Sequence, residues 1–144
     1  MADWPDGALE FAEQSRIARL ATSGADGAPH AVPICYIVDN ASLHTVVDAK
    51  PKSAPTRMRR LRNIAENPRA AVIIDRYDED WTRLEYVLLR GPAGIVTDAG
   101  EYAQAVDRLR TKYRQYRKMT FSVEANPLVR VDIESVHHWR YRAG

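Results

Sequence analysis

The sequence is poor in cysteine and lacks any long apolar run. Its single cysteine, Cys35, cannot form a disulfide within the chain, so a disulfide-stapled secreted fold is excluded and a reducing, cytoplasmic location is expected. No apolar run approaches the roughly 20 residues that a membrane-spanning helix needs, so we expect no membrane partner. Residues Met1–Trp4 lack a basic stretch followed by an apolar one, so we also expect no signal peptide.

The common catalytic and metal-binding motifs are absent as well. The sequence contains no Gly-x-Ser-x-Gly, no Gly-x-Gly-x-x-Gly and no phosphate loop ending in Gly-Lys-Ser/Thr. Of the four histidines, His137 and His138 are adjacent, and no His-x-x-x-His spacing occurs. We therefore expect no metal site, and hydrolase, kinase and Rossmann-type functions are not supported. No catalytic residue can be assigned from the sequence.

The remaining composition is typical of one folded domain. Apolar residues make up 45% of the chain and charged residues 28%, which argues against a disordered or fibrous protein. A chain of 144 residues is long enough to bury a core. We therefore expect residues 1–144 to form a single domain.

The net charge of +2 conceals an uneven distribution of basic residues. Seventeen of the 21 basic side chains are arginines, whose planar guanidinium groups match phosphate and carboxylate oxygens. Between Lys50 and Arg62 there are six basic residues and no acidic one. This segment is expected to contact an anion.

The second half of this basic segment has the pattern of a helix, predicted over Arg57–Ala65. Its apolar face is centred between Leu61 and Ile64, so Arg57 falls inside that face and Arg60 on its flank. A guanidinium on the core side needs a partner, and because the adjacent sequence has no carboxylate, a bound phosphate is an attractive one. Three further residues precede the helix and complete this candidate phosphate site: Lys50, Lys52 and Ser53.

Two other interpretations of the basic segment remain open. It can be a solvated helix face that pairs with distant acidic residues, as most charged helix faces do. Binding of nucleic acid is less well supported, because the net charge is small and no aromatic residues alternate with the basic ones. We therefore expect no nucleic-acid partner.

Hydrophobic periodicity predicts an α+β protein. The expected helices are Asp6–Arg16, Arg57–Ala65 and one that begins at Asp98 and continues to Tyr116. The expected strands are Arg16–Thr22, Ala28–Asp39, Leu43–Val47, Ala70–Asp75, Leu84–Val96 and Pro127–Tyr141. Because antiparallel connections dominate, the order favours an antiparallel sheet or small barrel with peripheral helices. The first three strands are expected to be consecutive antiparallel neighbours.

Three residues outside the basic segment are also candidates. Pro33 has no N–H to donate, so its strand has an edge, a bulge or a ligand at that point. Trp81 and Trp139 each pack in the core or a dimer contact, or else stack beside a flat ring.

Taken together, these segments resemble the pyridoxamine 5′-phosphate oxidase-like split β-barrel proteins. The resemblance rests on Leu20-Ala21-Thr22, Gly27 to Pro33, Leu43-His44-Thr45 and the basic helix running from Arg57 through Asn67-Pro68-Arg69 to Ala70. It is strongest to the actinobacterial branch of probable coenzyme F420-dependent enzymes. Met58-Arg59-Arg60 stands where the oxidases proper carry Ser-Arg-Lys, which argues against pyridoxamine phosphate as the substrate.

The resemblance implies a homodimer with two flavin-type sites at the subunit interface. Backbone groups of four residues would line the flat ring: Val32, Pro33, Ile34 and Cys35. The phosphate would be held by Lys50, Lys52, Ser53, Arg57 and Arg60, and Trp139 would approach the cofactor from the partner subunit.

The expected function is hydride transfer from reduced F420 to a small organic acceptor. The excess of basic groups suits the phosphate and glutamate tail of F420 better than it suits FMN. An FMN-dependent oxidoreductase of the same fold and a non-catalytic carrier of F420 or FMN are the alternatives.

Overall fold

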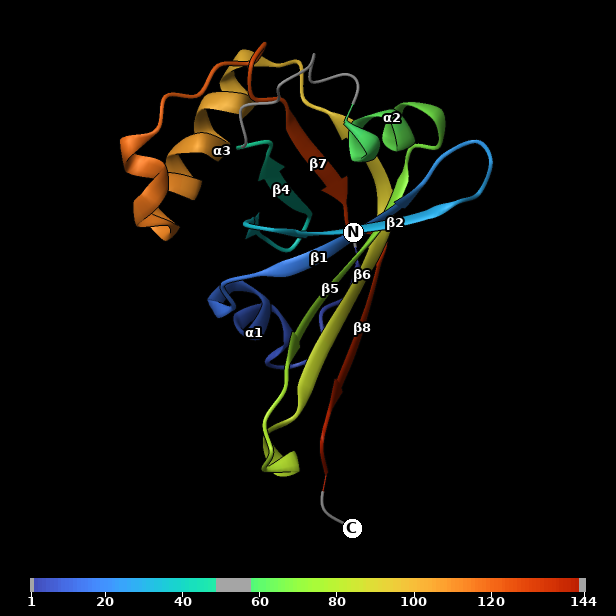
Figure 1. Ribbon diagram of the computed structural model, residues 1–144. Helices are drawn as coiled ribbons and strands as arrows, with labels where there is room; N and C mark the ends of the chain where they lie inside the picture. The colour runs from blue at the N-terminus through green and yellow to red at the C-terminus, as the bar shows by residue number, and fades with distance from the viewer. Residues whose placement is uncertain (1, 49–57, 143–144) are drawn as a thin grey trace.

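The computed structural model describes residues 2–48 and 58–142 (Figure 1). Its helices are α1 (Ala8–Gln14), α2 (Arg59–Glu66) and α3 (Ala99–Lys112), with short 3₁₀ segments η2 (Trp81–Arg83) and η3 (Arg114–Lys118). Its strands are β1 (Ala18–Ser23), β2 (Pro29–Ile34), β3 (Ile37–Val38), β4 (Ser42–Val46), β5 (Arg69–Arg76), β6 (Glu85–Ile95), β7 (Leu128–Asp132) and β8 (Ser135–Arg140).

The strands form one antiparallel sheet in the order β2-β1-β5-β6-β7-β4-β3, and β8 also pairs with β6. The sheet folds around a core, with α3 over one half and α1 beside the other (Figure 1). This arrangement confirms the expected α+β fold with a mainly antiparallel split β-barrel and peripheral helices.

The long strand β6 joins the two halves of the barrel. Its first part, up to Arg90, pairs with β8, and its last part, from Ala93, pairs with β7. Gly91 lies between these parts, where a Cβ atom would overlap the carbonyl oxygen of Asp132. Only glycine lets the two backbones pass this closely, so Gly91 allows β6 to serve both halves.

The interior contains two apolar clusters. The larger one fills the barrel and includes Leu20, Leu43, Val72, Ile74, Val87, Leu89, Val129 and Val131. The smaller one lies under α3 and includes Tyr102, Val106, Leu109, Tyr113, Tyr116 and Leu128. Burying a side chain such as Leu109 completely contributes about 2–3 kcal/mol, so α3 is held mainly by this face.

The expected continuous strand Ala28–Asp39 is wrong, because the chain bends after β2. Tyr36 is fully buried at the bend, and its hydroxyl donates to the carbonyl oxygen of Ala12 at 2.5 Å. Its backbone N–H donates to the hydroxyl of Tyr113 at 3.0 Å instead of to a neighbouring strand. The expected antiparallel pairings are present, β1 with β2 and β3 with β4, but the bend places them at opposite ends of the strand order, so the three strands do not form one continuous meander.

Two other elements are shorter than expected. The last helix ends at Lys112, and Tyr116 lies in η3. The Arg117 side chain donates to the carbonyl of Arg110 at 2.8 Å, which satisfies one of the acceptors that a helix end leaves unpaired. The expected strand Pro127–Tyr141 is divided into β7 and β8 at the crossing with Gly91.

Candidate cofactor site

Strand β2 forms an edge of the sheet. It pairs with β1 on one side and stands at the end of the strand order, with Pro33 opposite Arg19. The prediction that Pro33 marks an edge is therefore confirmed. Val32 packs partly against the core and Ile34 is buried, so the strand is anchored, and no strand of residues 2–48 and 58–142 pairs with its outer edge.

The end of β2 is tied to β4 through a side-chain hydrogen bond. The Thr45 hydroxyl donates to the carbonyl oxygen of Cys35 at 2.7 Å. Cys35 is a free, half-buried thiol, and Val46 ends β4 two residues before Asp48. The backbone at the end of β2 and the strand β4 are thus held at the same end of the barrel.

Asp48 and Tyr116 form a hydrogen-bonded pair beside this end. The Tyr116 hydroxyl donates to the Asp48 carboxylate at 2.5 Å. Burial, followed by the adjacent Asp48 carboxylate, raises the pKa of the Tyr116 hydroxyl, so it stays protonated and remains a donor. The pair fixes the carboxylate just after the end of β4.

Arg60 faces this pair from the first turn of α2. Its side chain is half-buried, and burial lowers the pKa of the guanidinium while the nearby Asp48 charge raises it. The sequence next to Arg60 has no carboxylate, but the fold brings Asp48 to it from the end of β4. The Asp48 carboxylate is engaged by Tyr116 and forms no ion pair with Arg60 within 4 Å, so this partly desolvated cation can accept further negative charge.

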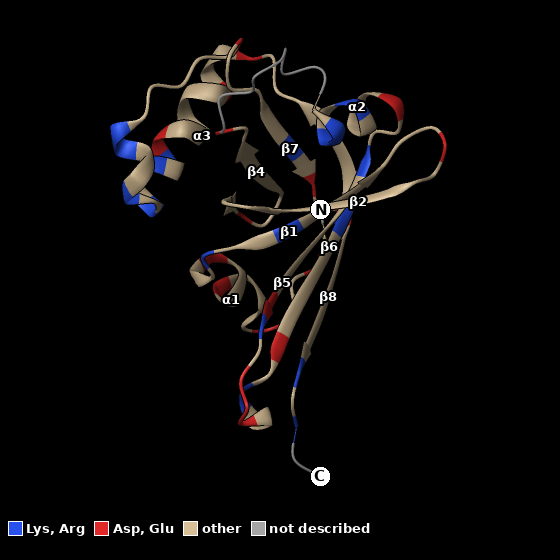
Figure 2. Cartoon of the chain, in the orientation of Figure 1, with Lys and Arg blue, Asp and Glu red and all other residues tan. Residues whose placement is uncertain are grey.

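Four predicted phosphate ligands, Lys50, Lys52, Ser53 and Arg57, lie outside the described residues. In the sequence they connect Asp48 to Met58, and so belong to the segment between the strand end and the helix that carry Asp48 and Arg60. Arginine is the basic residue type on α2, at Arg59, Arg60 and Arg62, whereas the tip between β5 and β6 carries several acidic residues (Figure 2). The described residues at this end thus fit the anionic part of a flavin-type cofactor.

Trp139 lies far from β2 within one chain. It projects from β8, is 41% exposed and stacks on Tyr86 with ring centroids 6.0 Å apart. Register pairs across the sheet run in one row through Pro33, Arg19, Ile73, Leu88 and His137. With about 4.8 Å between neighbouring strands, the two ends of this row are roughly 19 Å apart. One chain therefore does not bring Trp139 to Val32–Cys35.

Asp48 and Tyr116 are site residues that sequence reasoning missed. Asp48 directly precedes the basic segment, which was a usable signal, whereas the apolar spacing of Tyr116 indicated only a core position. Within residues 2–48 and 58–142, no group of three or more His, Cys, Asp and Glu side chains could hold a metal ion. In the same ranges, no helix is both long and apolar enough to cross a membrane.

Comparisons with solved structures reveal the same fold in proteins of different function. A conserved hypothetical protein of Mycobacterium tuberculosis is 19% identical, with a TM-score of 0.77 over 97% of this chain and 87% of that one. The FAD-binding protein of Mycobacterium smegmatis is 18% identical, with a TM-score of 0.66 over 97% and 98% of the two chains. The heme storage protein of Vibrio cholerae is 14% identical, with a TM-score of 0.68 over 91% and 89%.

These low identities establish the fold alone, and no curated protein matches the chain significantly. A family model is more specific. The model described as pyridoxamine 5′-phosphate oxidase matches residues 5–140, from the segment before α1 to the last residue of β8. The chain therefore belongs to the pyridoxamine 5′-phosphate oxidase family.

Proposed function

We propose that the protein is a homodimeric oxidoreductase that binds a flavin-type cofactor between its subunits and uses F420 as that cofactor. The observation that carries the proposal is the separation of the two parts of the site across the sheet. The open β2 edge and Arg60 lie at one side of the barrel, and the exposed Trp139 lies at the other. A second copy related by a two-fold axis supplies Trp139 where the first copy supplies β2.

The outward face of the larger half of the sheet supports this assembly. Its residues alternate with the core residues and include Ala21, Ala71, Ile73, Tyr86, Leu88 and Trp139. The same face also carries Arg19, Asp75, Arg90 and His137, so it combines apolar and polar side chains, as protein interfaces commonly do. The face also continues from β2 to β8, so that one interface would join both parts of the divided site.

The side chains have separate tasks in this proposal. The backbone edge of Val32–Cys35 orients the flat ring, and Arg60 with the adjacent basic segment binds the anionic part. The partner subunit's Trp139 covers the ring and excludes water, which strengthens the electrostatic contacts inside. When bound, the cofactor would supply hydride transfer to a small organic acceptor, while the protein supplies position and charge.

FMN is the second candidate cofactor. The match to the pyridoxamine 5′-phosphate oxidase family and the FAD-binding neighbours favour a flavin. The basic segment Lys50–Arg62 favours F420, because its phosphate and glutamate tail carry more negative charge than FMN. A carrier function is the remaining alternative, since one structural neighbour is a heme storage protein.

A paired titration of the purified protein separates these possibilities. F420 and FMN are added in parallel and binding is followed by their fluorescence, with hemin as a third ligand followed by absorbance. We expect saturable binding of F420 at one site per chain. Tight binding of FMN with no binding of F420 would show that the cofactor is FMN rather than F420. Binding of hemin alone would contradict a flavin-type site.

Turnover then distinguishes an enzyme from a carrier. Reduced cofactor is offered in excess together with a quinone, a nitro compound or biliverdin, and its oxidation is followed by absorbance. The proposal expects many turnovers per site with at least one acceptor. Binding without turnover across all three acceptor classes would indicate a carrier.

A further inference from the structure

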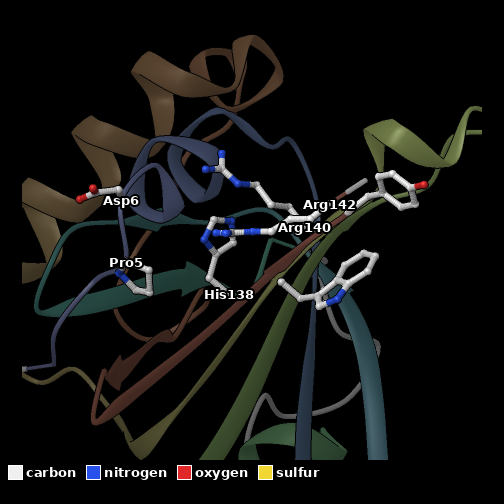
Figure 3. A pocket seen from close by; sticks show the side chains of 7 residues that line it. Pro5, Asp6, His138, Arg140 and Arg142 are labelled. Atoms are coloured by element: carbon white, nitrogen blue, oxygen red, sulfur yellow. The ribbon is translucent and has the colours of Figure 1, made fainter. Parts of the chain in front are cut away.

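A cavity of about 730 Å³ lies between the N-terminal segment and the last strand (Figure 3). It is lined by Pro5, Asp6, His138, Trp139, Arg140, Tyr141 and Arg142. The cavity is separate from the open edge of β2 and from Arg60. Trp139 borders the cavity as well, but the basic groups His138, Arg140 and Arg142 have no task in the proposed cofactor site.

Strand geometry directs three basic side chains into this cavity. Residues two apart on a strand project to the same face, and the Tyr141 N–H donates to the carbonyl of Leu84 at 3.1 Å, which continues the pairing past the end of β8. His138, Arg140 and Arg142 consequently share one face. Figure 3 shows them pointing together toward the N-terminal segment.

The two arginines form no ion pair among the described residues, although Glu85 is the cross-strand neighbour of Arg140. No ion pair of residues 2–48 or 58–142 includes Arg140 or Arg142. Asp6 also lines the cavity, but Figure 3 shows its carboxylate directed away from both guanidinium groups. With Cα atoms about 7 Å apart on one strand face, the two cations repel each other, and one anion could bind both.

His138 is held beside them by a fixed carboxylate. Its Nε2 lies 2.7 Å from Glu85 Oε2, and the two side chains are only 6% and 11% exposed. Arg76 donates to the other oxygen of Glu85 at 3.2 Å. Because a carboxylate only accepts, Nε2 donates to Glu85, and in the tautomer that carries its one proton on Nε2 the Nδ1 atom is an acceptor.

We propose that this cavity binds a small molecule with two anionic groups, phosphates or carboxylates, and a hydroxyl group. Arg140 and Arg142 would bind the anionic groups, and Nδ1 of His138 would accept from the hydroxyl. The side chains that carry the proposal lie on the face of β8 opposite to Trp139. The site thus gives the protein a second ligand, distinct from the ring of the cofactor.

Isothermal titration calorimetry with inorganic pyrophosphate and with citrate tests the proposal. We expect the full-length protein to bind at least one of these probes, pyrophosphate if the site prefers phosphates and citrate if it prefers carboxylates. The double variant R140Q/R142Q should bind at least tenfold more weakly, since each charge-assisted contact contributes to affinity. The control R114Q removes an exposed arginine of η3 and should leave the affinity unchanged.

Cofactor affinity is measured on the same variants, so that the two sites can be told apart. R140Q/R142Q should bind F420 or FMN as the unmodified protein does. Absence of binding of both probes, or equal weakening by R114Q, would overturn the proposal. If the double variant does not fold, phenylglyoxal labelling of the unmodified protein replaces it, with pyrophosphate or citrate expected to protect Arg140 and Arg142 but not Arg114. Equal labelling with and without the probes would overturn it too.

Discussion

At the scale of single residues, what distinguishes Arg60 is its surroundings in the folded chain rather than its membership of a basic segment. Arg60 is half-buried and faces Asp48 and Tyr116, whereas Arg62 on the same helix is exposed. The sequence predicted that Arg60 lies on the flank of the helix. It could not predict the nearby Asp48 carboxylate, because Asp48 follows β4 and comes near Arg60 only in the folded chain.

Replacing Arg60 should weaken cofactor binding. The change R60M removes a cation that would contact the anionic part of the cofactor, and we expect a loss of affinity of about tenfold or more. The matched change R62M removes the same charge from an exposed position and should have little effect. Fluorescence titration measures both, with thermal unfolding as a check on folding. Equal losses in the two variants would mean that only the overall charge matters.

Lys112 gives a second prediction at this scale. Its amino group has no hydrogen-bond partner among the described residues and lies 3.9 Å from the centre of the Tyr36 ring. Burial lowers the pKa of Lys112 from 10.5 to about 8. Between these pH values the unfolded chain binds more protons than the native one, so stability rises with pH in this window.

The variant K112M should therefore be more stable than the unmodified protein at pH 7, because it removes a buried charge without a hydrogen-bond partner. The difference in free energy of unfolding should shrink as the pH rises from 8 toward 10.5. Urea unfolding at several pH values measures this, with the exposed Lys118 changed to methionine as the control. A difference that stays constant with pH would show that the methionine acts through packing alone.

At the scale of secondary-structure elements, the crossing at Gly91 decides how the barrel closes. A Cβ atom at Gly91 would overlap the carbonyl of Asp132, whereas a Cβ atom at Gly94, in the same strand, meets nothing within 4 Å. The two glycines look alike in the sequence. Only the packing of β6 against the turn between β7 and β8 distinguishes them.

The two glycines should consequently respond in opposite ways to alanine. G91A should destabilise the protein by about 3 kcal/mol or more, because the backbones must separate. G94A should leave stability unchanged or increase it by about 0.5–1 kcal/mol, since alanine loses less backbone entropy. Urea unfolding midpoints compare them. Similar destabilisation by both changes would contradict the close crossing.

Most elements could be predicted from the sequence because their patterns are local. The period-2 alternation of β1 and the helical spacing from Tyr102 to Leu109 both correspond to observed elements. The bend at Tyr36 and the end of α3 at Lys112 could not be predicted. Both depend on hydrogen bonds to partners distant in the chain or supplied by side chains, such as that between Tyr36 and the hydroxyl of Tyr113.

At the scale of the whole molecule, the two parts of the candidate site lie on strands that are far apart in the sheet, β2 and β8. The sequence resemblance predicted that Trp139 approaches a partner's cofactor, and the separation of Trp139 from β2 within one chain is consistent with that geometry. The assembly itself remains a proposal. In that assembly each complete site requires residues from two chains. Single substitutions, which change both chains of a homodimer, cannot reveal which chain supplies which residue.

Mixed dimers test this central claim most directly. R60M and W139A are each expected to bind cofactor poorly as homodimers. A mixed dimer, prepared by co-expression with two affinity tags, contains one site that lacks both residues and one site with Arg60 and Trp139 intact. The measurement is the number of cofactor molecules bound per mixed dimer in a fluorescence titration. We predict one molecule per dimer, bound with the affinity of the unmodified protein, whereas no high-affinity binding would contradict a site shared between two subunits.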